Sequence, residues 1–173
     1  MNVGRLAAAF LVLVALLGGG MIWWLQTRAF YDDPVPLTAL RFTLSNGAVT
    51  DARTTGTAID AVSSPLRYRA CAQVVDGLPE AQRDALVPAE GAAPTVAPGW
   101  FDCFDADAIG ADLAAGAATA VIGTKDQLYG IDRLVALYPD GRAFAWHQIN
   151  ECGEVVFDGR PAPEGCSEPP EDD

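Results

Sequence analysis

The chain has 173 residues, 50% of them hydrophobic, and a formal net charge of −12 at neutral pH. All 23 acidic residues lie at or beyond Asp32 together with nine of the 11 basic residues, so the body that follows carries a formal charge of −14. Nucleic-acid binding depends on a basic surface, and this charge excludes it. The length beyond Asp32 suffices for one domain with a hydrophobic core.

An apolar stretch of 20 residues without a charged side chain runs from Leu6 to Leu25. A helix rises about 1.5 Å per residue, so this stretch is long enough to cross a hydrocarbon core of roughly 30 Å. Trp23 and Trp24 lie at its far end, where aromatic rings prefer the headgroup layer. We therefore expect residues 6–25 to anchor the chain in the lipid bilayer, with residues 1–5 in the cytoplasm. A cleaved signal peptide is the alternative.

Four cysteines follow the anchor, and no two of them form a C-x-x-C pair. An even number on one side of a membrane indicates structural disulfides in an oxidising compartment. This places the body in the periplasm and the anchor in the inner membrane. Three pairings are open; we favour Cys71 with Cys103 and Cys152 with Cys166, because each closes a short segment rich in turns. Four free thiols in a cytosolic domain are the alternative.

The first half of the body reads mainly as strands. After a linker over residues 26–36, residues 37–44 and 48–53 are predicted to form a hairpin around Asn46-Gly47, followed by a loop over residues 54–64. Residues 66–75 alternate as in a strand, with Arg67 and Arg69 on one face. Residues 79–87 suit a short helix that Pro88 ends, and residues 88–99 suit a loop.

The second half combines one helix with a strong hairpin signal. Asp105 suits the N-cap of a helix over residues 106–115, and Gly116 suits its end. Residues 118–123 suit a strand, residues 131–138 and 142–150 a hairpin around Pro139-Asp140-Gly141, and residues 155–157 an edge strand. Residues 167–173 are predicted to be a disordered acidic tail. We therefore expect an α+β domain over residues 37–166, built on an antiparallel sheet with two short helices.

His147 is the only histidine and therefore the only ready proton donor or acceptor near neutral pH. Ala143 and Ala145 lie on the same strand face as His147, and such small side chains either allow close packing or leave a pocket. His147 is therefore either a hydrogen-bonded structural residue or part of a pocket. Nucleophilic catalysis would need a partner that this base activates, and no G-x-S-x-G motif occurs. The residues that we expect to line such a pocket beside His147 are Arg67, Arg69, Trp100 and Asp102. The two arginines could hold a carboxylate or phosphate, or pair with acidic side chains of the chain itself.

Metal and nucleotide sites find no support in the spacing of the residues. Asp102, Asp105 and Asp107 fail the pattern of a calcium-binding loop, and helix capping explains the last two. The cysteine spacings of 32, 49 and 14 residues match no common zinc pattern. No glycine-rich phosphate loop follows a predicted strand. We expect no metal, cofactor or nucleotide.

Four segments resemble an uncharacterised family of short, single-anchor alphaproteobacterial membrane proteins: SSPLRYRAC at 63–71, APGWFDCFD at 97–105, WHQIN at 146–150 and CGEVVFDGRPAPEGC at 152–166. Some relatives carry the label histidine kinase, which would imply a glycine-rich ATP lid and a phosphoacceptor helix around His147. This sequence has neither. The family has no established active-site residues, so the resemblance implies a topology and leaves the function open. Our leading hypothesis is a non-enzymatic periplasmic domain that binds a partner protein, and the alternative is a small-molecule sensor or hydrolase with a pocket around His147.

Overall fold

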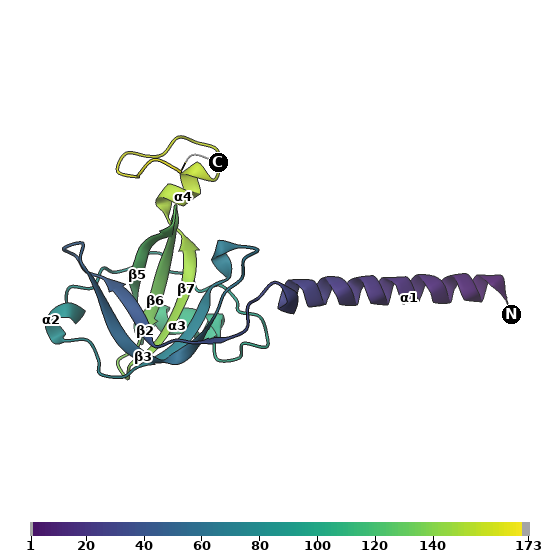
Figure 1. Ribbon diagram of the computed structural model, residues 1–173, viewed down its shortest axis with the longest axis horizontal. Coiled ribbons are helices and arrows are strands. Elements are labelled where there is room, and N and C mark those ends of the chain that lie inside the picture. The colour runs from purple at the N-terminus through teal and green to yellow at the C-terminus, as the bar shows by residue number, and fades with distance from the viewer. Residues whose placement is uncertain (1, 171–173) are drawn as a thin grey trace.

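A computed structural model of the chain describes residues 2–170 and shows a long helix that projects from a domain rich in strands (Figure 1). Helix α1, Val3–Trp24, buries none of its residues against the rest of the chain. A π-helical turn, Leu25–Ala29, continues it, and the combined Val3–Ala29 segment has a mean hydropathy of 2.3. By length and composition this segment can cross a membrane. The apolar stretch that was expected to form the anchor is therefore part of one continuous helix.

The domain is built on an antiparallel sheet of seven strands in the order β1-β3-β4-β7-β6-β5, with β2 pairing beside β1 on the long strand β3. The strand bounds are β1 Val35–Pro36, β2 Ala39–Thr43, β3 Val49–Ile59, β4 Arg69–Val74, β5 Thr119–Leu128, β6 Ile131–Leu137 and β7 Arg142–Ile149. The predicted hairpins around Asn46-Gly47 and Pro139-Asp140-Gly141 are both present as β2–β3 and β6–β7. The α+β fold class is confirmed.

The sheet curls until its two ends nearly meet (Figure 1). The hydroxyl of Thr43 at the end of β2 donates to the carbonyl of Gly123 in β5 at 3.0 Å. Val87 fills the gap beside them, since its N–H donates to the carbonyl of Thr43 and its carbonyl accepts from the N–H of Ile122. A Cβ on Gly123 would lie 3.1 Å from the carbonyl oxygen of Arg41, so a side chain there would press β2 and β5 apart.

Both faces of the curled sheet are covered. The inner face encloses a core that includes Leu40, Phe42 and Val135. The outer face carries Trp146, which is fully buried, and is covered by helix α3, Ala106–Ala114, and the segment that precedes it. Two disulfides complete the domain, Cys71–Cys103 and Cys152–Cys166, so the favoured pairing is confirmed.

Several predicted boundaries are wrong for identifiable reasons. Residues 54–59 are not loop, because β3 continues to Ile59 to pair with β4 and β1. Residues 65–67 form a 3-10 turn, so the strand predicted from residue 66 begins only at Arg69. The helix predicted over residues 79–87 is one turn, α2 Glu80–Arg83, because the following residues bridge β2 and β5. The strand predicted over residues 118–123 extends to Leu128.

The predicted edge strand at residues 155–157 is also wrong, because this segment belongs to helix α4, Glu151–Val156. The side chain of Asn150 caps α4 by accepting from the N–H of Gly153 and also donates to Asp126 and Asp132. The described residues thus hold three short α-helices after α1, one more than expected. The predicted acidic tail has no helix or strand up to residue 170, and residues 171–173 lie outside the described residues.

We expect Asn150→Ala to lower the free energy of unfolding by about 1–2 kcal/mol, because it removes a helix cap and two hydrogen bonds to carboxylates. Chemical denaturation of the full chain in detergent measures the effect. Asn46→Ala, in an exposed turn, removes only one local hydrogen bond and is the control. An equal loss in both variants would contradict this role for Asn150.

Candidate functional site

His147 lies on β7 with its side chain 4% exposed, stacked on the ring of Tyr68 at a centroid distance of 4.7 Å. Its Nδ1 lies 2.6 Å from the carbonyl oxygen of Pro65, which can only accept, so Nδ1 carries the proton. Its Nε2 accepts from the Nε–H of Arg133 at 3.0 Å. Both ring nitrogens are therefore occupied, and the imidazole is held in its neutral form.

Burial lowers the pKa of His147 below its ordinary value. The hydrogen bond that its Nδ1–H donates to the carbonyl of Pro65 acts in the opposite direction, and the positive charge of Arg133 lowers the pKa further. Burial likewise raises the pKa of Tyr68. A neutral imidazole with no free nitrogen has no lone pair to offer a substrate. The imidazole of His147, on β7, instead connects the turn at Pro65 with Arg133 on β6 through its two hydrogen bonds.

A cavity of about 380 Å³ nevertheless opens beside His147, and we name it the polar cavity because charged side chains line it together with apolar ones. The guanidinium of Arg133 lies 3.9 Å from the centre of the Tyr68 ring and also borders this cavity. Two exposed carboxylates, Asp32 and Asp60, also line this cavity. The cavity therefore combines one cation with two acids.

Arg69 and Arg67, which were predicted to share a strand face, have different surroundings. Arg69 is 4% exposed and donates to the main-chain carbonyls of Leu66, Tyr68, Thr95 and Val96. It thereby fixes the loop over the outer face of the sheet. Arg67 lies in the 3-10 turn, half-buried, with its guanidinium 5.3 Å from the ring centre of Tyr31.

The two remaining predicted residues, Trp100 and Asp102, lie outside the His147 cavity. Trp100 donates from its indole nitrogen to the carbonyl of Thr27 at 2.5 Å, and so contacts the end of the anchor. Asp102 is exposed. Of the five candidate residues, only His147 lines the polar cavity.

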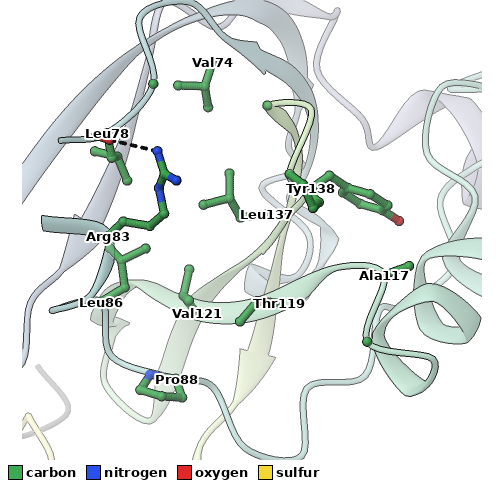
Figure 2. Close-up of a pocket in the computed structure, with 14 residues that line it drawn as sticks. Val74, Leu78, Arg83, Leu86, Pro88, Ala117, Thr119, Val121, Leu137 and Tyr138 are labelled. Carbon is green, nitrogen blue, oxygen red and sulfur yellow. Dashed lines mark hydrogen bonds between the residues drawn. The ribbon is translucent and has the colours of Figure 1, made fainter. Parts of the chain in front are cut away.

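A larger cavity, of about 490 Å³, opens at the end of the curled sheet beside α2 (Figure 2). Its wall is mostly apolar and combines residues from β4, β5, β6 and the segment around α2. Figure 1 shows α2 on the side of the domain opposite to α1, so this cavity lies away from the anchor. The main apolar residues of its wall are Val74, Leu78, Leu86, Pro88, Val121 and Leu137.

Among residues 2–170, Arg83 is the only charged side chain that lines the apolar cavity. It is exposed, extends between Leu78 and Leu86, and donates to the carbonyl of Leu78 at 3.2 Å (Figure 2). No ion pair among the described residues includes it. Tyr138 turns its hydroxyl away from the cavity to donate to Asp112, and burial, followed by this hydrogen bond, raises the pKa of Tyr138 to about 12.

No pattern in the sequence predicted this cavity. Its walls come from residues as distant as Val74 and Leu137, and they meet only because β5 and β6 curl toward the chain around α2. Arg133, which contacts His147, was also not predicted from the sequence. The predicted hairpin of β6 and β7 could have indicated this contact, because it places Arg133 directly opposite His147. Within residues 2–170, no group of three or more metal-ligating side chains comes together.

The fold and these cavities define a class of protein: a domain on a curled antiparallel sheet, closed by two disulfides and joined to one apolar N-terminal helix. Residues 37–167 match the model of a family of unknown function, DUF6446, and the chain belongs to that family. The resemblance seen in the sequence, to an uncharacterised family, is thereby confirmed. No curated protein and no solved structure matches the chain.

Proposed function

We propose that this protein is a non-enzymatic, membrane-anchored domain of the periplasm that binds a segment of a partner protein, as an accessory or assembly factor for envelope or inner-membrane proteins. The observation that carries the proposal is the apolar cavity with Arg83 at its edge. It has the size of a typical ligand pocket, and its wall is built from aliphatic side chains.

The two disulfides support a position on the periplasmic side of the inner membrane, with residues 1–5 in the cytoplasm. Disulfides form and persist in oxidising compartments, and all four cysteines are paired. The apolar helix α1 supports a single membrane pass.

The chemistry of the cavity indicates what segment of a partner would fit it. Aliphatic walls favour a bulky apolar side chain, and the unpaired guanidinium of Arg83 favours a nearby carboxylate, from Asp, Glu or a chain terminus. The rest of the domain is strongly acidic, so it repels carboxylates elsewhere. An acidic residue next to an apolar anchor is therefore the sequence pattern that we expect in the partner.

The alternative is a small-molecule sensor or hydrolase that uses the polar cavity beside His147. One observation favours it: Arg133 and two carboxylates line an open cavity there. The occupied nitrogens of His147 argue against base catalysis. Loss of a cellular phenotype in His147→Ala with unchanged thermal stability would favour this alternative.

Photo-crosslinking from the cavity tests the proposal. A photoreactive amino acid placed at Thr119, an exposed residue of the cavity wall, should give a discrete adduct with an envelope protein in intact cells. Arg83→Glu should reduce the adduct about tenfold or more, because it replaces an attractive charge by a repulsive one. Arg160→Glu makes the same charge change at an exposed residue that does not line the cavity and should leave the adduct unchanged. An adduct that is insensitive to Arg83→Glu, or no adduct, would refute binding at this cavity.

A further inference from the structure

A second feature, separate from the apolar cavity, lies where the anchor meets the domain. The anchor ends in a π-helical turn, and the indole of Trp100 donates to the carbonyl of Thr27 in that turn. The ring of Tyr31 meets the Trp100 ring edge-on at a centroid distance of 5.7 Å. The loop that carries Trp100 is itself tied to β4 by the disulfide at Cys103. The end of the anchor is therefore held directly against the disulfide-linked domain.

Two arginines flank this aromatic pair. The guanidinium of Arg28 lies 4.3 Å from the centre of the Trp100 ring, and that of Arg67 lies 5.3 Å from the centre of the Tyr31 ring. Neither arginine takes part in an ion pair among residues 2–170. The Nη1 atom of Arg67 is buried and has no hydrogen-bond partner there. Both guanidiniums are therefore oriented by aromatic rings, and neither pairs with a carboxylate of residues 2–170.

The position of these two charges indicates which anion they would bind. Arg28 follows Trp24, the last residue of α1, by one helical turn, so it lies at the level of the lipid headgroups when α1 spans a bilayer. Guanidinium groups bind phosphate oxygens through paired hydrogen bonds. We propose that Arg28 and Arg67, stacked on Trp100 and Tyr31, bind the phosphate of an anionic phospholipid at the membrane surface.

The acidic residues around the two arginines limit how this part of the domain can bind an anionic lipid. Asp32, Asp33 and Asp102 are exposed close by in the sequence, and the domain as a whole is acidic. A general attraction between the domain and an anionic membrane is therefore absent. Binding must depend on the two oriented guanidiniums, and a lipid held there would fix how the domain stands on the membrane.

Native mass spectrometry of the full chain, released from nanodiscs of equal phosphatidylglycerol and phosphatidylcholine, tests the proposal. We expect the native chain to retain phosphatidylglycerol in preference, and Arg28→Gln with Arg67→Gln to cut the retained fraction at least about tenfold. The matched control is Arg53→Gln with Arg160→Gln, two exposed arginines whose loss should leave retention unchanged. Arg28→Gln alone, on the exposed end of the anchor, leaves the domain core intact and should give a smaller loss.

Three results would overturn the assignment. Unchanged retention in both Arg28 variants would show that the lipid binds elsewhere. An equal loss in the control pair would show an effect of overall charge. Complete displacement of the lipid by millimolar inorganic phosphate would assign the arginines to a soluble anion.

Discussion

Removing the Cys71–Cys103 disulfide by a double change to alanine is expected to lower the free energy of unfolding by about 3.7 kcal/mol, the chain-entropy value for a loop of 32 residues. Loss of this disulfide should also change the structure locally. This bridge joins the central strand β4 to the loop that carries Trp100, so its loss frees the loop from the outer face of the sheet. We expect the Trp100 contact with the anchor to loosen together with the fold.

Thermal and chemical denaturation of the full chain in detergent measures this effect. The matched control is the double alanine variant at Cys152 and Cys166, whose loop of 14 residues predicts a smaller loss of about 3.0 kcal/mol. That bridge joins α4 to the C-terminal segment, far from Trp100 in the sequence. Limited proteolysis should therefore cut residues 88–102 only in the Cys71/Cys103 variant. Equal protease resistance of both variants would contradict the role of the first bridge.

His147→Ala is expected to lower the free energy of unfolding by about 2–4 kcal/mol, because it leaves the carbonyl of Pro65 and the Nε–H of Arg133 without their partner and opens a gap beside Tyr68. Chemical denaturation at pH 7.5 measures the loss. Val62→Ala, at a residue that is 92% exposed and lines the same cavity, is the control and should change stability by less than about 0.5 kcal/mol. If His147→Ala lowers the free energy of unfolding by less than about 0.5 kcal/mol, the structural role of His147 is contradicted.

The same histidine predicts how stability depends on pH. Its pKa is lowered in the folded state, so the unfolded chain takes up a proton first as the pH falls. The free energy of unfolding should therefore be constant above the ordinary histidine pKa of about 6.5. It should decrease below that pH, by at most about 1.4 kcal/mol per pH unit.

Because His147 is the only histidine, few other groups titrate between pH 5.5 and 7.5. The free energy of unfolding, measured by chemical denaturation at several pH values in this range, should decrease toward low pH for the native chain and stay constant for His147→Ala. Equal slopes in the two proteins would show that the pH dependence comes from another group.

Local patterns in the sequence determined most of the secondary structure and both disulfides. The uncharged run at residues 6–25, the Asn46-Gly47 and Asp140-Gly141 turns, and the Asp105 cap each specify a conformation within a few residues, so the sequence alone predicted them. The cysteine pairing followed from the same local logic. Boundaries failed where a distant strand supplied the hydrogen bonds, as at residues 54–59, or where a local cap overrode the pattern, as at Asn150.

The cavities and the junction with the anchor were decided by tertiary structure alone. Arg83 became the single cation of an apolar cavity because the sheet curls and β5 approaches the segment after α2. Trp100 reached Thr27, 73 residues earlier, because a disulfide places its loop over the outer face of the sheet. The periodicity of a sequence predicts on which face of a helix or strand a side chain lies, but not which other segment packs against that face. Contacts between distant segments are therefore known only from the tertiary structure.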